Sequence, residues 1–173
     1  MNIHVFEKIW LGVSLLLIVS FIGTIVYGSL VAGVSMVDDE GGTVDPSNIV
    51  GSENFREPGV YRSSDGTYDV YIIARQFAFS PGTGQAIRIP ADTKVTLHIT
   101  SGDVVHGFQV TGTNINTMVI PGQVSQMTVK FDEPGTYHIV CNEYCGAGHH
   151  VMEGTIEVVP KDQFNDATGG DSQ

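Results

Sequence analysis

The sequence predicts an all-β sandwich domain that one N-terminal transmembrane α-helix holds to a membrane. Two patterns carry this prediction. Residues 9–37 form an uninterrupted stretch without a charged side chain, and a helix needs about 20 apolar residues to cross the hydrocarbon core of a bilayer. Residues 67–160 instead alternate apolar and polar side chains in short runs between turn signals, which is typical of β-strands.

The apolar stretch predicts a retained anchor over residues 1–37. It is longer than the apolar core of a secretory signal peptide, which has about 7–15 residues, and an acidic segment follows it directly. Lys8 precedes the stretch, and no Lys or Arg follows it until Arg56. The positive-inside rule therefore predicts a single-pass protein of the plasma membrane, with a cytoplasmic N-terminus and a domain on the outer face.

The protein is strongly acidic, with 19 Asp and Glu against 8 Lys and Arg and a net charge of −11. Glu7 and Lys8 cancel each other, so the chain beyond the anchor carries the whole imbalance. This charge disfavours nucleic acid and anionic lipid surfaces as partners. It fits a basic partner, and it equally fits a very saline cell, where the Debye length falls to about 3 Å at 1 M salt.

Turn signals without periodicity mark residues 38–66, which we interpret as a connector, and residues 161–173 have the composition of a polar tail. Between them, about seven or eight short strands predict a two-sheet antiparallel sandwich over residues 67–160. In one of these strands, Val95, Leu97 and Ile99 share a face. The clearest strand segments are Tyr68–Ala74, Lys94–Thr100, Val124–Phe131, Thr136–Val140 and Thr155–Val159.

A loop between the last two predicted strands gathers metal-binding side chains: Cys141, Cys145, His149 and Met152. Thiolate and thioether are soft ligands, and imidazole binds copper as well as zinc. A mononuclear blue-copper site needs one Cys, two His and a Met, so this loop lacks one His and has a surplus Cys. His106 is available upstream to supply the missing imidazole, and the complete set suits two copper ions bridged by both sulfurs.

These side chains stand in a longer pattern. It reads H-G-F-x-V from His106, P-G-x-x-S from Pro121, and P-G-x-Y-x-x-x-C-N-x-Y-C-G-x-G-H-x-x-M from Pro134. The pattern resembles subunit II of haem–copper terminal oxidases (cytochrome c oxidases), which carries the binuclear copper centre Cu(A). A single anchor resembles the B-type members. The resemblance covers residues 68–159 and implies a cupredoxin-like Greek-key sandwich.

The resemblance also implies a role for each candidate ligand. Cys141 and Cys145 would bridge the two copper ions, and His106 and His149 would each bind one of them. Met152 would be a weak axial ligand, and the backbone carbonyl of Glu143 would be the other. In A-type relatives a Glu at this place also offers its carboxylate to magnesium, whereas B-type relatives can have Gln.

Residues around the ligands have weaker assignments. The resemblance places the surface through which electrons arrive at an aromatic segment, which corresponds here to Phe77 and Phe79, although both can equally be packing residues. Polar side chains next to copper ligands tune a metal site through hydrogen bonds. We expect Asp103, Asn116 and Asn142 to do this.

The resemblance implies an electron-transfer subunit of a respiratory oxidase. Its copper centre would accept electrons from a soluble donor, a cytochrome c or a small blue-copper protein. It would pass them through His149 to haem in subunit I, which reduces O2 and pumps protons. The alternatives are a stand-alone blue-copper carrier, which the surplus Cys disfavours, and a simple Cys141–Cys145 disulfide in an oxidising compartment.

Overall fold

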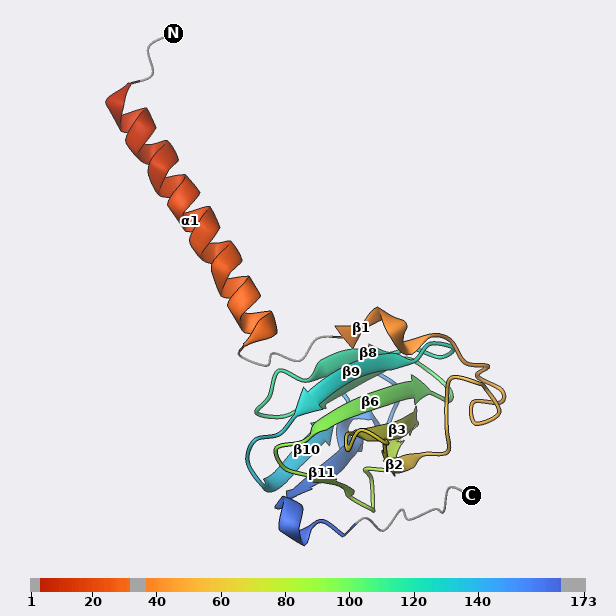
Figure 1. Cartoon of the computed structure of the whole chain (residues 1–173). Helices are drawn as coiled ribbons and strands as arrows, with labels where there is room; N and C mark the ends of the chain where they lie inside the picture. Colours follow the sequence, from red (N-terminus) through yellow and green to blue (C-terminus); the bar gives the residue numbers. More distant parts are fainter. Residues whose placement is uncertain (1–3, 32–36, 166–173) are drawn as a thin grey trace. The chain divides into compact units, whose positions relative to one another are not determined.

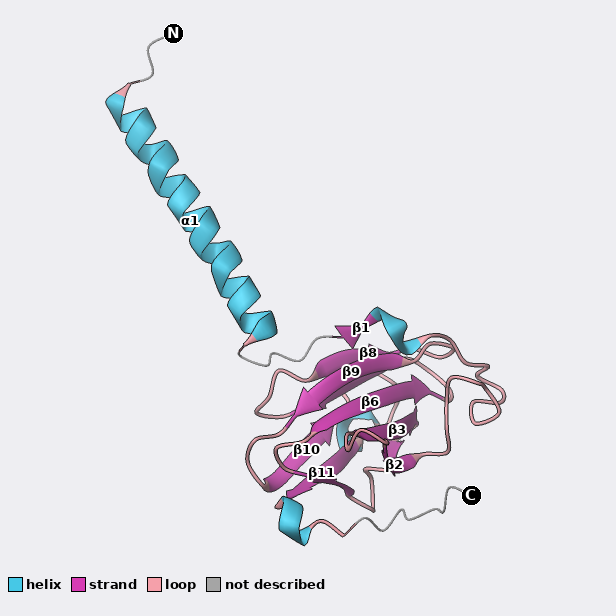
Figure 2. Ribbon diagram, viewed as in Figure 1, coloured by secondary structure: helices cyan, strands magenta, loops and turns pink. Residues whose placement is uncertain are grey.

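The computed structural model describes residues 4–31 and 37–165. Parts of the predicted anchor and tail, residues 1–3, 32–36 and 166–173, fall outside the described residues. The chain divides into two compact units, Met1–Val34 and Ser35–Gln173. The described residues form one α-helix, eleven strands and three short 3-10 helices (Figures 1 and 2).

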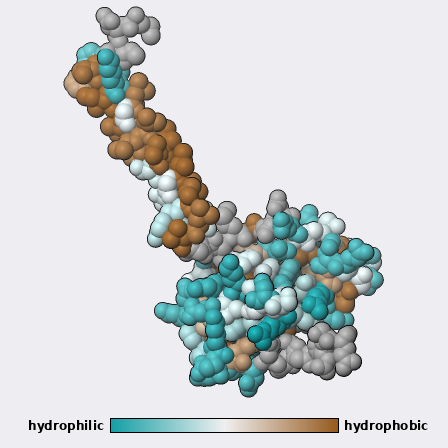
Figure 3. Space-filling view, viewed as in Figure 1, coloured by the Kyte–Doolittle hydropathy of each residue, from teal (hydrophilic) through white to brown (hydrophobic). Residues whose placement is uncertain are grey.

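The first unit is the helix α1, Val5–Leu30. A capping interaction begins it, because the His4 backbone N–H donates to Glu7 Oε2 at 3.0 Å. At 1.5 Å per residue its 26 residues span about 39 Å, more than the roughly 30 Å of a hydrocarbon core. None of its side chains is buried, and Figure 3 shows its apolar surface. The predicted helix is therefore present, and it is long and apolar enough to cross a membrane.

The second unit is a sandwich of two sheets, as predicted. The first sheet has the strand order β1-β9-β6-β3-β2, with β4 also paired to β3. Its strands are β1 Val37–Asp38, β2 Gly59–Arg62, β3 Tyr68–Arg75, β4 Ala78–Ser80, β6 Lys94–Ser101 and β9 Ser125–Lys130. The second sheet has the order β5-β11-β10-β7-β8. Its strands are β5 Ile87–Pro90, β7 His106–Val110, β8 Asn116–Val119, β10 Gly135–Val140 and β11 Glu153–Val159.

The sheets are mixed, which corrects the antiparallel prediction. β3 pairs with β6 in parallel, and β5 pairs with β11 in parallel. Alternation of side chains reveals which face of a strand is buried, but it carries no information on the direction of the neighbouring strand. Each parallel pair needs a crossover connection, and between β3 and β6 the chain makes it by crossing to β5 in the other sheet.

The main core lies between the sheets. Val95, Leu97 and Ile99 are fully buried there, which confirms the face predicted for this strand. The segment 38–66, predicted as a connector, is folded onto the domain instead. Its side chains Val44, Ile49 and Phe55 form a second buried cluster with Ile73 and Val124. Three apolar residues at irregular spacing have no strand or helix period, so the sequence pattern does not reveal this packing. Short helices complete the unit: η1 Asp39–Gly41, η2 His149–Val151 and η3 Lys161–Gln163.

Candidate metal centre

Strand register brings the two parts of the candidate site together. β10 and β7 are antiparallel neighbours, with Val140 opposite Gln109 and Ile139 opposite Val110. A chain that continues past Val140 in this direction runs along the start of β7, where His106 lies. The loop that carries the cysteines therefore begins beside this histidine, although the sequence separates them widely.

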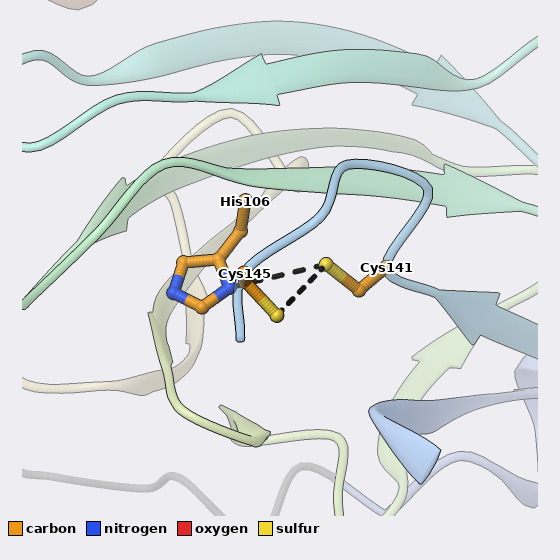
Figure 4. Close-up of side chains that lie close together, drawn as sticks. All are labelled: His106, Cys141 and Cys145. Atoms are coloured by element: carbon orange, nitrogen blue, oxygen red, sulfur yellow. Dashed lines mark hydrogen bonds between the residues drawn. The ribbon is translucent and has the colours of Figure 1, made fainter. Parts of the chain in front are cut away.

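The first sulfur lies at the junction of these segments. Cys141 Sγ is 3.9 Å from His106 Nδ1, 3.7 Å from Cys145 Sγ and 3.2 Å from the carbonyl oxygen of Glu143. Figure 4 shows the imidazole ring and the two sulfur atoms close together at the base of the loop. The ligand atoms of His106, Cys141 and Cys145 all lie within 4.8 Å of one another, a spacing that a metal ion can fill.

The second sulfur gathers the remaining candidate ligands. Cys145 Sγ is 3.6 Å from His149 Nδ1 and 3.6 Å from Met152 Sδ. Local backbone bonds set this geometry, because His149 N–H donates to the Gly146 carbonyl and Met152 N–H to the His149 carbonyl, both at 3.1 Å. The four other donors that the sequence singled out thus lie around the two thiols.

The chemistry of this donor set fits copper. Both cysteines are free and buried, and their sulfurs are too far apart for a disulfide, whose bond length is about 2.05 Å. Burial, together with the neighbouring Cys141, raises the pKa of Cys145 to about 11. Such a thiol stays protonated until a cation displaces the proton. Two thiols, two imidazoles and a thioether are ligands that copper prefers.

Asp103 holds His106 from the side opposite the sulfur. The fully buried His106 donates from Nε2 to Asp103 Oδ1 at 2.7 Å. A carboxylate only accepts, so this bond leaves Nδ1 free to bind a metal. Desolvation raises the pKa of Asp103, but hydrogen bonds from His106, Gln76 N–H and Val104 N–H outweigh it, and the pKa is lowered. The carboxylate is therefore charged where it supports the imidazole.

The other two polar residues expected near the ligands form a pair. Asn142 lies in the loop between β10 and β11, residues 141–152, which we call the metal loop. Its Nδ2 donates to Asn116 Oδ1 at 3.0 Å and so ties the metal loop to β8. Gly107 makes room for this contact, because a Cβ at this position would lie 1.9 Å from Asn142 Oδ1 and 2.9 Å from the Glu143 backbone nitrogen. The glycine of the H-G-F segment therefore permits the close approach of the loop to β7.

The two aromatic residues of the candidate electron-entry segment have different surroundings. Phe79 is 1% exposed and packs edge-on against Phe108 in the core, so it is not available at a surface. Phe77 is half-buried against the metal loop, where a Cβ on Gly148 would lie 2.5 Å from its ring. The sequence pattern also missed Gln76, whose backbone N–H donates to Asp103 and whose side chain donates to the Cys145 carbonyl. The sequence offered one hint of its role, because Gln76 directly precedes Phe77, which was already a candidate site residue.

Comparisons with known proteins identify the family of this chain. Residues 65–159 match the family described as "Cytochrome C oxidase subunit II, periplasmic domain". A "Cytochrome c oxidase subunit 2" of Thermus thermophilus is 40% identical over 157 residues, which cover 88% of this chain and 91% of that protein. A "Heme-copper oxidase subunit 2" of Aeropyrum pernix is 37% identical over 99 residues, 53% of this chain and 42% of that protein.

A solved structure extends the agreement over most of the chain. A chain in the cryo-EM structure of "a heme-copper terminal oxidase dimer" superposes with a TM-score of 0.68 at 39% identity. The match covers 88% of this chain and 99% of that one. The family match over residues 65–159 includes the loop with the two cysteines. This chain therefore belongs to the cytochrome c oxidase subunit II family, as its resemblance implied.

Proposed function

We propose that this chain is the electron-transfer subunit of a respiratory haem–copper oxidase and that its β-domain holds two copper ions. The observation that carries the proposal is the convergence of four further donors on two buried, free thiols. One copper ion with a blue-site ligand set would leave one of these thiols without a role. Family membership supports the oxidase part of the proposal.

Each ligand has a distinct task. Cys141 and Cys145 would bridge the two ions, and His106 and His149 would each close one side. Met152 and the Glu143 carbonyl would be the weaker donors. The Glu143 carboxylate instead accepts from the Tyr144 N–H at 3.1 Å, so we assign only its backbone to copper. Copper bound there would supply a one-electron couple shared through both thiolates.

The surrounding protein suits electron transfer better than substrate chemistry. Protein donors fill the whole candidate ligand set, which leaves no exchangeable position of the kind that a catalytic metal site keeps open. Cys141, Cys145, Met152 and His106 are buried. Strand β7 and the Asp103 carboxylate fix His106. A ligand set that moves little when its charge changes favours fast electron exchange, because little reorganisation is required.

The partners follow from this role. Subunit I of the oxidase would receive the electrons through His149 at its haem, where O2 is reduced and protons are pumped. A soluble donor, a cytochrome c or a small blue-copper protein, would deliver them one at a time. For a soluble donor to reach the β-domain, the domain must face outward, with the end of the chain before α1 in the cytoplasm. Lys8 before the span, with no Lys or Arg after it until Arg56, supports this orientation.

Copper analysis combined with EPR spectroscopy tests the proposal on the full chain in detergent. We expect two copper ions per chain that share one unpaired electron, with hyperfine structure from both nuclei. One copper with the spectrum of a blue site would identify a mononuclear carrier instead. A chain that binds no copper and forms the Cys141–Cys145 disulfide would refute the proposal.

A further inference from the structure

Gln76 connects the two ligand-bearing segments of the site. It follows directly after β3, in the sheet opposite the one that carries the ligands. Its side-chain amide donates to the carbonyl oxygen of Cys145. Its backbone N–H donates to Asp103 Oδ2 at 2.8 Å, and the other oxygen of this carboxylate accepts from His106 at 2.7 Å. A continuous path of hydrogen bonds thus runs from one ligand to the other through Gln76.

The metal loop is shaped to receive this side chain. Gly146 lies next to Cys145 with a φ of +130°, a backbone conformation that favours glycine. A Cβ at this position would lie 2.7 Å from Gln76 Nε2, which is closer than real Cβ contacts. Glycine at 146 therefore satisfies two requirements at once, the turn of the loop and the approach of the glutamine amide.

Burial does not explain the position of Gln76. The residue is exposed, and an exposed glutamine gains little from the hydrophobic effect while it loses side-chain freedom when it is held in one conformation. The bond to the Cys145 carbonyl instead constrains the backbone of this residue. The sulfur of the same residue touches Cys141, His149 and Met152. A shift of this carbonyl would change three of the donor distances together.

We propose that Gln76 is a positioning residue of the metal centre, which holds the Cys145 half of the ligand set at a fixed distance from the His106 half. The inference rests on the proposed copper function. Through this bond Gln76 limits movement of the bridging sulfur when the charge of the centre changes. Hydrogen-bonded groups around metal ligands act in this way in other sites, and their loss typically lowers metal affinity by 10–100-fold.

Two substitutions separate the hydrogen bond from simple packing. Gln76→Ala removes the whole side chain, whereas Gln76→Glu keeps its shape but cannot donate to a carbonyl at neutral pH. Gln85→Ala is the matched control, because Gln85 is also exposed and lies in a loop outside the site. All variants are compared as full chains in detergent, and thermal unfolding of the metal-free chains shows whether each one folds.

The first measurement needs no copper. In the reduced, metal-free chain, alkylation of Cys145 relative to Cys141 reports how often the loop leaves its place. We expect both Gln76 variants to raise this ratio several-fold and Gln85→Ala to leave it unchanged. In copper-loaded chains we expect release to a chelator to be faster by roughly 10-fold, the lower end for a lost outer hydrogen bond, together with altered copper hyperfine couplings.

Two results would overturn the proposal. If both Gln76 variants match Gln85→Ala in alkylation and copper release, Gln76 has no positioning role. If Gln76→Glu matches the parent chain while Gln76→Ala does not, the role is steric rather than hydrogen-bonded. If the parent chain binds fewer than two copper ions, the proposed function fails, but the alkylation ratio still decides whether Gln76 holds the loop.

Discussion

The two histidines that are candidate ligands are held in different ways. His106 begins a strand inside a sheet, is fully buried and donates to a carboxylate. His149 lies in the short helix η2, is half-buried, and has its ring 5.9 Å from Tyr144, a side chain that is 74% exposed. One half of the site is therefore built by the sheet, and the other half depends on the shape of a loop.

This contrast indicates where substitutions act. Substitutions in the strand half, around His106, affect a side chain whose position the sheet already fixes. They therefore mainly alter the electronic surroundings of this histidine. Changes in the loop half alter the positions of several donors together, because backbone hydrogen bonds link the loop residues to one another and Gln76 of the opposite sheet holds the Cys145 carbonyl. We expect the largest effects on metal binding in the loop half.

The strongest effect should follow Cys145→Ser. Cys145 Sγ touches Cys141, His149 and Met152, so its loss removes the one donor common to the loop half. A hydroxyl is a poor substitute for a soft thiolate. We expect the signal of two coupled copper ions and the oxidase activity of the assembled complex to be lost. EPR and copper analysis measure this change, and retention of two coupled ions would contradict the bridging role.

The shape of the loop is tested by Gly148→Ala. The added Cβ would lie 2.5 Å from the Phe77 ring, and overpacking of this kind typically costs about 1–3 kcal/mol. We expect a lower unfolding temperature and faster copper loss. Combining it with Phe77→Ala should remove the clash and restore part of the copper retention.

Gly135→Ala provides the matched control for this substitution. Its Cβ would meet Tyr137 at an ordinary distance of 3.9 Å, and Gly135 begins β10 at the end of that strand away from the cysteines. Additive effects of Gly148→Ala and Phe77→Ala would show that the two residues do not constrain each other.

The difference between the halves also explains what the sequence could predict. Alternation identified the buried faces of the main strands, and the spacing of Cys141, Cys145, His149 and Met152 was enough to predict that these donors gather in one loop. His106 was assigned by family resemblance and by its place near a strand end. Each of these signals is local, either a period of two or a cluster of ligands.

The missed features are all contacts between distant segments. Burial of Val44, Ile49 and Phe55 depends on a sheet face that their own spacing does not reveal. The parallel partners of β3 and β5 depend on the path of the chain, not on the pattern within a strand. Gln76 lies beside the cysteine loop only because the two sheets bring their ends together.

A smaller effect is expected in the strand half from Asp103→Asn. The amide is similar in size but uncharged, and one of its two oxygen positions becomes a donor, so it cannot keep all the bonds from His106, Gln76 and Val104. We expect the fold and both copper ions to be retained at full loading. Copper affinity should fall by about 10–100-fold, measured by chelator competition. An unchanged affinity and spectrum would show that the strand alone fixes His106.

The smallest effect should come from Met152→Leu. Met152 is buried, and Leu has a similar volume, so the free energy of unfolding should change by less than about 1.5 kcal/mol. Two thiolates and two imidazoles remain to hold copper, because a weak axial donor tunes a potential more than it binds. We therefore expect full copper content with a shifted reduction potential, and no shift for the exposed Met118→Leu control. An unchanged potential in Met152→Leu would mean that the Met152 sulfur is only a packing group, and the loop would then contribute both thiols, the Glu143 carbonyl and His149 to the centre.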